Sequence, residues 1–225
     1  MRTGFLSQVS ALLWKDLVLE FRTRELLGGM ALFSLLVLLV FNFAFDLRVD
    51  NLAGVAPGVL WVAFTFAGVL GLGRSFVAEK DRGALDGLLL APIDRGAIYL
   101  AKLIANVIFM GIVEAVCLPV FTAFFNYGSI SLDILVIALL GTIGFSAIGT
   151  LFSAMTTNLR ARDVMLPLLV FPICVPVVIA AVEATALAFS GGLAGNQLRW
   201  IALLAAFDLI FGILCFAIFE FVVEE

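Results

Sequence analysis

The 225-residue sequence contains no histidine. Imidazole is the base of Ser–His–Asp triads and a frequent ligand of zinc and of haem iron, so sites that depend on it are excluded. Cys117, Cys174 and Cys215 form no CxxC pair, and each lies within an apolar run. We therefore interpret them as small core residues, and we expect no catalytic residue and no metal site in this chain.

Charge is also scarce. Only 13% of the residues are charged, 64% are hydrophobic, and the mean hydropathy is +1.20. Ordinary soluble domains are about half apolar and a quarter charged. The composition excludes a soluble enzyme, a disordered chain and a collagen-like fibre. Because the uncharged runs are long and continuous, they indicate membrane-spanning helices rather than the alternating strands of a β-barrel.

Six runs are long enough to cross a bilayer, which takes about 20 apolar residues. They cover residues 26–45, 51–73, 98–125, 134–159, 164–189 and 198–223. We predict an all-α fold with six transmembrane helices in a single domain over residues 1–225. An even number of spans places both termini on the same side of the membrane.

The basic residues indicate which side this is, because cytoplasmic loops carry an excess of Lys and Arg. Eleven of the 13 basic residues fall on the side of the termini, and only Arg48 and Arg199 fall on the other side. We therefore expect both termini in the cytoplasm. No cleavable signal is visible, since the first apolar run begins after 25 residues that include acids.

Residues 1–25 are expected to carry a helix that begins near residue 5. Trp14, Val18 and Phe21 recur at spacings of three and four, while charged residues that include Asp16 and Glu20 lie mostly on the other side. Such a helix fits the membrane interface, with Trp14 at the depth of the headgroups. The alternative is a cytosolic extension of the first span.

The segment 74–97 between the second and third spans is a candidate coupling loop. Its leucines would share one face of a short helix and several of its charges another, and Pro92 would end the helix. A short cytoplasmic helix of this kind suits docking into a groove of another protein. The alternative is a solvated loop whose leucines cover the underside of the bundle. The candidate docking residues are Glu79, Asp81, Arg82, Leu85, Asp86, Leu88 and Leu89.

The fourth span carries small and polar residues at four-residue intervals, namely Thr142, Ser146 and Thr150, with Gly149 alongside. Small residues at this spacing let helix backbones approach closely in lipid, either inside the bundle or at a subunit interface. The fifth span is expected to be bent or broken, because each of its three prolines removes a backbone donor. They are Pro167, Pro172 and Pro176.

Four acids lie within the spans: Glu220 is near the inner interface, and the other three are candidate path-lining or buried polar residues. Glu114 is 12 residues beyond Lys102, which is about 18 Å along a helix and therefore near the middle of the membrane. Asp208 is similarly deep, and Glu183 is nearer the outer interface. Ionised carboxylates are costly in hydrocarbon, so these acids either line a substrate path or clamp spans together. The alternative is a protonated acid that is bonded to a neighbouring helix.

The sequence lacks the motifs of several membrane machines. It has no reactive set for a membrane enzyme, no convincing internal repeat, no filter-like segment and no G-x-x-x-x-G-K-[ST] sequence. This chain therefore does not bind ATP by a P-loop. An ATP-driven role would need a separate nucleotide-binding partner, and the segment 74–97 would be its contact.

Three stretches resemble the B subunit of the cytochrome c maturation system, the haem exporter permease family. The first is residues 79–92, with Ala-Lys-Leu at 101–103 after it. The second is Trp-Lys-Asp-Leu at 14–17 with Glu20 and Arg22. The third begins with Gly-Thr-Ile-Gly-Phe at 141–145 and continues through Gly149, Arg160, Leu-Pro at 166–167 and residues 172–176. The likeness covers nearly the whole chain.

The resemblance implies an ABC-type permease subunit of the bacterial inner membrane. It would work with a separate ATPase dimer and with haem-handling membrane subunits, and the segment 74–97 would transmit ATP hydrolysis to the spans. Haem would be exported, or released to a periplasmic chaperone, as substrate rather than as a bound cofactor. A second copy of the chain and membrane lipid are the other partners expected, and no nucleic acid is.

In one respect the sequence departs from this family. Members carry a histidine early in the third span, where this chain has Asn106. Any haem contact would therefore depend on apolar surface, Tyr, Met or Cys, which favours a coupling role over direct haem ligation. Two alternatives stay open: a permease that exports another lipid or drug-like molecule, and a non-transporting scaffold for the haem-handling subunits.

Overall fold

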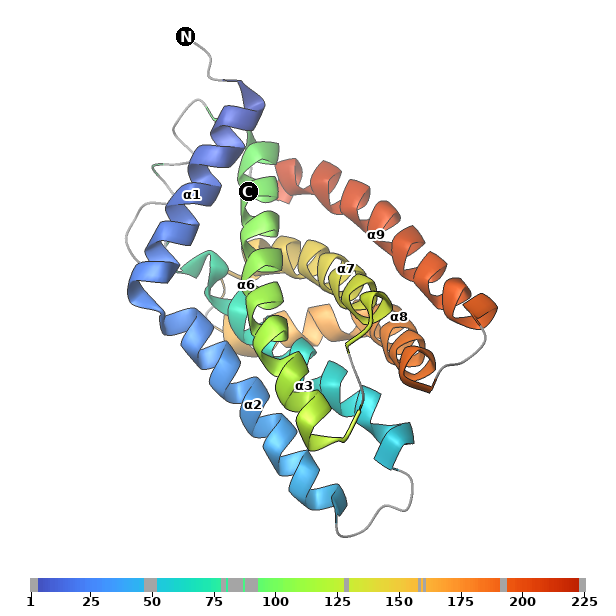
Figure 1. The fold of residues 1–225 in the computed structure, drawn as a ribbon. Coiled ribbons are helices and arrows are strands. Elements are labelled where there is room, and N and C mark those ends of the chain that lie inside the picture. Colours follow the sequence, from blue (N-terminus) through green and yellow to red (C-terminus); the bar gives the residue numbers. More distant parts are fainter. Residues whose placement is uncertain are drawn as a thin grey trace.

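The computed structural model describes residues 4–46, 52–77, 80, 87, 93–127, 130–157, 159, 161–190 and 194–222. Within these residues, every secondary-structure element is an α-helix, and Figure 1 labels the helices. They are α1 (Phe5–Thr23), α2 (Glu25–Asp46), α3 (Leu52–Ser75), α6 (Arg95–Phe124), α7 (Leu132–Thr156), α8 (Arg162–Ser190) and α9 (Ala194–Val222). The prediction of an all-α fold is confirmed.

The six helices from α2 to α9 are each long and apolar enough to cross a membrane, as predicted. Some boundaries differ from the uncharged runs. α6 begins at Arg95 because Asp94 caps it, accepting a 2.9 Å hydrogen bond from the Gly96 N–H. α7 ends at Thr156, before the uncharged run does. Charge therefore locates the spans but does not fix where their helices end.

The fifth span is one continuous helix. α8 runs from Arg162 to Ser190 with Pro167, Pro172 and Pro176 inside it, so the expectation of a break is wrong. Proline removes one intrahelical bond and is tolerated in membrane helices because neighbouring helices re-satisfy the freed backbone groups. A bend is compatible with this continuity, whereas a break is not.

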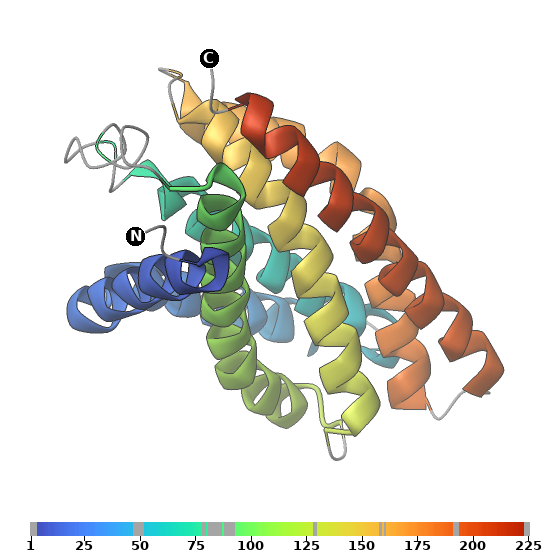
Figure 2. The ribbon, with the colours of Figure 1, turned by 90° about the horizontal axis from the view of Figure 1, so that it is seen from above.

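α3 and α7 form the centre of the bundle. α7 contacts α3, α6, α8 and α9, whereas α1 and α2 lie at one edge and α9 at the other (Figures 1 and 2). The close approach of α7 to α3 depends on residues without side chains. A Cβ at Gly141 would overlap the ring of Trp61, and one at Gly149 would overlap Leu72. Small residues thus set the distance between the central helices.

α1 meets α2 at a sharp turn and packs across α6 (Figure 2). Arg24, between the two helices, adopts a left-handed conformation with φ of 56° and donates its N–H to the Glu20 carbonyl at 2.6 Å. Trp14 is 69% exposed, as expected for the outer face of an interfacial helix. The opposite face does not point to water, because Asp16 and Glu20 are buried.

Candidate functional site

The predicted docking residues of the segment 74–97 lie outside the described residues. They are Glu79, Asp81, Arg82, Leu85, Asp86, Leu88 and Leu89. The structure describes residues 74–77 and 93–97 on the two sides of them, and Lys80 and Gly87 among them. These flanks show which helices the two ends of the segment contact.

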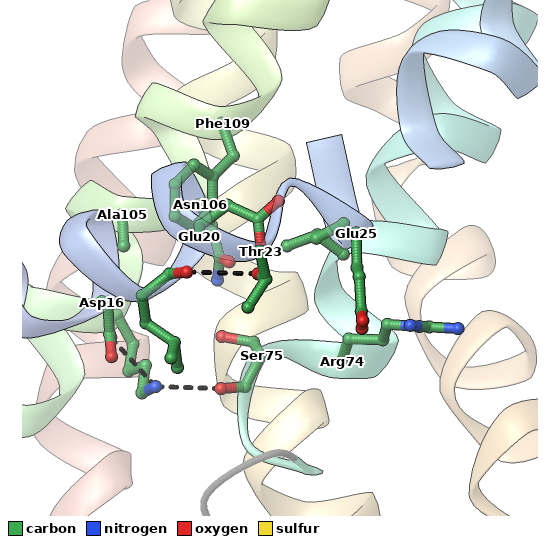
Figure 3. A pocket seen from close by; sticks show the side chains of 12 residues that line it. Asp16, Glu20, Thr23, Glu25, Arg74, Ser75, Ala105, Asn106 and Phe109 are labelled. Carbon is green, nitrogen blue, oxygen red and sulfur yellow. Dashed lines mark hydrogen bonds and ion pairs between the residues drawn. The ribbon is translucent and has the colours of Figure 1, made fainter. Parts of the chain in front are cut away.

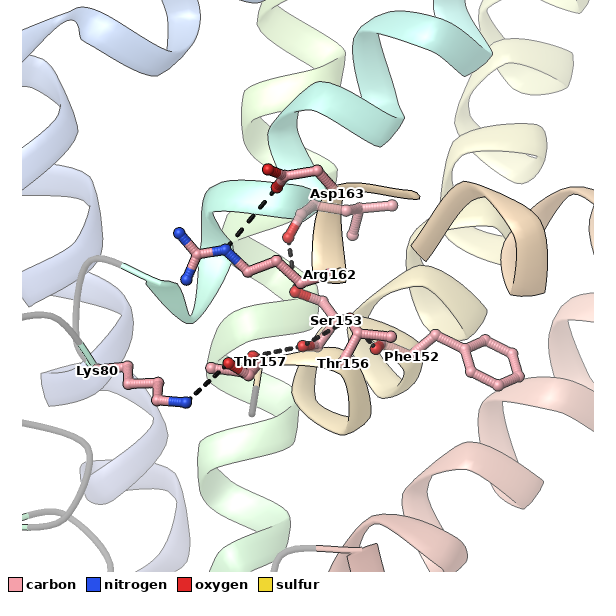
Figure 4. Close-up of polar contacts among 8 residues, drawn as sticks. Lys80, Phe152, Ser153, Thr156, Thr157, Arg162 and Asp163 are labelled. Atoms are coloured by element: carbon pink, nitrogen blue, oxygen red, sulfur yellow. Dashed lines mark hydrogen bonds and ion pairs between the residues drawn. The ribbon is translucent and has the colours of Figure 1, made fainter. Parts of the chain in front are cut away.

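The beginning of the segment is attached to the end of α7. Lys80 Nζ donates to the Thr157 carbonyl at 2.9 Å (Figure 4). The neighbouring hydroxyls are used within α7 itself, since Thr157 Oγ1 donates to the Ser153 carbonyl at 2.5 Å and Thr156 Oγ1 to the Phe152 carbonyl at 2.8 Å. The last carbonyls of a helix lack intrahelical donors and carry partial negative charge, so a lysine there is favourable.

The end of the segment is attached to α1 and α9. The Asp94 N–H donates to Gln8 Oε1 on α1 at 3.0 Å, while the Asp94 carboxylate caps α6. Next to it, Arg95 Nη1 donates to the Glu220 carbonyl on α9 at 3.4 Å. A displacement of the segment would therefore act on α7 at one end and on α1, α6 and α9 at the other.

Lys102 on α6 joins three elements in a buried cluster. Its Nζ lies 3.0 Å from Asp16 Oδ2 on α1 and donates to the carbonyl of Ser75, the last residue of α3, at 2.9 Å (Figure 3). The same atom lies 5.4 Å from the centre of the Phe76 ring. Lys102 is 6% exposed and Asp16 9%, so each charge depends on the other for solvation.

A pocket of about 140 Å³ adjoins this cluster, between α1, the start of α2, the end of α3 and α6 (Figure 3). Its charged lining residues are Asp16, Glu20, Glu25, Arg74 and Lys102. Glu20 Oε1 accepts a hydrogen bond from the Leu27 N–H at 2.8 Å, which satisfies one of the free donors at the beginning of α2.

Deeper in the bundle, α6 and α7 share a row of polar contacts that we call the polar seam. It consists of Asn106, Met110 and Glu114 on α6 and of Thr150, Ser146 and Thr142 on α7. Asn106 Nδ2 donates to Thr150 Oγ1 at 2.9 Å, and Ser146 Oγ to Met110 Sδ at 3.5 Å. Residues four apart on one helix thus pair with residues four apart on its antiparallel neighbour.

The last pair of the seam holds the buried acid Glu114. Thr142 Oγ1 donates to Glu114 Oε1, and Glu114 is only 5% exposed. The space lined by Glu114, Met110, Met30 and Phe64 is too small for a water molecule. Among the described residues, the geometry is that of an acid bonded to a neighbouring helix.

The other two acids lie elsewhere. Asp208 on α9 packs against Gly144 of α7, and neither carboxylate oxygen has a hydrogen-bond partner among the described residues. Glu183 on α8 is exposed and lines a separate pocket of about 470 Å³ with Arg199 and other residues of α9. The structure therefore does not bring the three acids together in one cavity.

The small residues of α7 serve different neighbours. Thr142, Ser146 and Thr150 are buried in the polar seam, whereas Gly149 faces Leu72 on α3. The partners of these residues on α6, above all Asn106, could not be predicted from the spacing on α7. Lys102 was part of the family resemblance, but no partner was predicted for it. The signal that could have indicated its partner is the spacing of Asp16 and Glu20, which are four residues apart on one helix face.

Comparison with known proteins identifies the family. The model of the family described as "CcmB protein" matches residues 7–222. The chain belongs to the CcmB family. The resemblance predicted from the sequence is thereby confirmed, and the match includes most of α1 and the whole segment 74–97.

Curated relatives agree with this CcmB assignment. Proteins named "Heme exporter protein B" match from Pseudomonas aeruginosa, with 28% identity over 89% of this chain and 90% of the relative, and from Rhodobacter capsulatus, with 35% identity over 77% and 80%. A third, from Paracoccus denitrificans, is 33% identical over 78% of this chain and 81% of the relative. With six candidate spans, this member of the CcmB family is a multi-pass membrane protein.

Proposed function

We propose that this chain is the permease subunit of an ATP-driven complex that exports haem, or releases it to a periplasmic chaperone, for cytochrome c maturation. The relatives' shared name, "Heme exporter protein B", supports haem as the substrate. The chain would lie in the bacterial inner membrane as one domain over residues 1–225. The distribution of basic residues supports cytoplasmic termini.

The segment 74–97 is proposed as the site where a separate ATPase dimer docks. The observation that carries this proposal is the attachment of its two ends, through Lys80 to α7 and through Asp94 to α1. A partner that moved the segment would move several spans together. Haem-handling membrane subunits and a second copy of this chain are further proposed partners.

The docking proposal is tested by reversing two charges of the segment, Glu79→Lys with Asp81→Lys, and measuring recovery of the ATPase with the tagged permease. We expect recovery and cytochrome c yield both to fall. The matched control is Asp133→Lys, an exposed acid in the first turn of α7, at the opposite end of that helix from Thr157. Unchanged recovery and unchanged yield would remove the docking proposal.

A non-transporting scaffold is a second candidate, favoured by the closed packing around Glu114. A scaffold predicts that Glu114→Gln and Asp208→Asn leave cytochrome c maturation unaffected while the complex still assembles. A transporting permease predicts reduced maturation in an assembled complex. The two functions are separated by measuring subunit co-elution and cytochrome c yield in the same strains.

A further inference from the structure

The pocket beside α1 is lined by three charged residues that form no ion pair with any residue that the structure describes. Its volume of about 140 Å³ is about ten times the roughly 10–15 Å³ that one water molecule needs by a comparable measure. Asp16 and Lys102 neutralise each other at one end of the pocket. Glu20, Glu25 and Arg74 remain as the other charged groups of its lining.

Glu20 is the most constrained of these groups. It is 8% exposed, and the one hydrogen bond that it accepts among the described residues, from the Leu27 N–H, engages Oε1. Its second oxygen is therefore available to a ligand in the pocket. A buried carboxylate is costly unless donors or a cation surround it. Glu25 and Arg74 are exposed and form no ion pair with any described residue.

The position of the pocket indicates which kind of ligand can enter it. Glu25 is the first residue of the span α2, and Arg74 lies in the last turn of the span α3, so the pocket is at the level where spans leave the hydrocarbon. α1 forms one wall and exposes Trp14 on its outer side, as helices at the headgroup level do.

We propose that this pocket binds the phosphoethanolamine headgroup of a zwitterionic phospholipid. The primary ammonium lies against Glu20 and Glu25, and the phosphate lies against Arg74. An ammonium offers three N–H donors to the carboxylates, whereas the trimethylammonium of choline offers none. The guanidinium of Arg74 matches a phosphate with two parallel hydrogen bonds. An anionic headgroup without an amine would face the two carboxylates without a compensating charge.

The test is native mass spectrometry of the full-length protein, purified in detergent and mixed with equal amounts of three lipids with identical acyl chains. The lipids carry ethanolamine, choline or glycerol headgroups. We expect retention of phosphatidylethanolamine to exceed that of the other two about tenfold, equivalent to about 1.4 kcal/mol. Glu20→Gln and Glu25→Gln should each reduce this preference, whereas Arg74→Gln should reduce the retention of all three lipids, because all three carry the phosphate. Glu183→Gln and Arg199→Gln should leave the preference for phosphatidylethanolamine unchanged, because these residues line the separate pocket where α8 ends and α9 begins.

A second arm distinguishes a lipid from a soluble source of the same headgroup. Glycerophosphoethanolamine, which has no acyl chains, should compete only weakly with the lipid; strong competition would overturn the assignment to a lipid. Equal retention of the three lipids by the unmodified protein would overturn the whole proposal, as would unchanged retention of phosphatidylethanolamine by Arg74→Gln. Since Glu25 and Arg74 are exposed, their variants keep the test decisive if Glu20→Gln does not fold. The result does not depend on haem export.

Discussion

α6 uses its polar residues in two different ways along one helix. Lys102, Asn106, Met110 and Glu114 follow each other at four-residue intervals. At the end of the span, Lys102 forms a full ion pair with Asp16 and contacts the end of α3. Deeper, the other three meet uncharged hydroxyls of α7. The comparison shows that paired charges join elements near the membrane surface, whereas hydroxyl contacts join spans within it.

The largest expected effect is at the charged end. Asp16→Asn removes the carboxylate that lies 3.0 Å from the buried Lys102 ammonium, which should destabilise the protein by about 3–5 kcal/mol. Thermal unfolding in detergent measures this loss. The double variant Asp16→Asn with Lys102→Met should lose less than the sum of the two single variants. An unchanged unfolding temperature for Asp16→Asn would contradict the role of this pair.

The next effect concerns the packing that holds α7 against α3. Gly149→Val would overlap Leu72 and should cost about 1–3 kcal/mol through overpacking. Gly111→Val is the matched control on α6, because a Cβ there meets nothing within 4 Å. Equal unfolding temperatures for the two variants would show that the close approach of α7 to α3 is not needed for stability.

The polar seam should respond less than the charged end. Thr142→Val removes the donor to Glu114, and interhelical hydrogen bonds in membranes contribute about 0.6 kcal/mol on average and about 1.7 at most. Ser146→Ala removes only a long contact with a sulfur atom, so its effect should be smaller still. If Thr142→Val lost as much stability as Asp16→Asn, the hydroxyl contacts of the polar seam would be as important as the ion pair, which would contradict the comparison.

The smallest effect on stability is expected at the attachment of the coupling segment. Lys80→Ala removes a contact with the C-terminus of α7, where a favourable cation contributes about 0.3–1 kcal/mol. The same variant should lower cytochrome c yield, because the segment would no longer act on α7. A normal cytochrome c yield, with the ATPase still recovered with the permease, would show that Lys80 is not needed to transmit ATP hydrolysis to the spans. Transmission would then depend on the contact of Asp94 with α1.

Part of this organisation could be predicted from the sequence, because composition and small-residue spacing are local signals. The six spans and the stripe at Thr142, Ser146 and Thr150 are of this kind. The pairing of Asp16 with Lys102 could not be predicted, since the two residues are 86 positions apart and each also fits a solvated helix face. The sharp turn at Arg24 could not be predicted either, because no strong sequence signal marks an arginine with a left-handed backbone conformation.

The central claim is that the segment 74–97 faces the cytoplasm, where an ATPase can bind it. It is tested most directly by labelling Leu88→Cys with a membrane-impermeant thiol reagent, against Leu132→Cys, an exposed position at the opposite end of α7 from Thr157. The native cysteines are buried and give little background. We expect intact cells to label Leu132→Cys alone and inverted vesicles to label Leu88→Cys. Labelling of Leu88→Cys from outside intact cells would contradict the account.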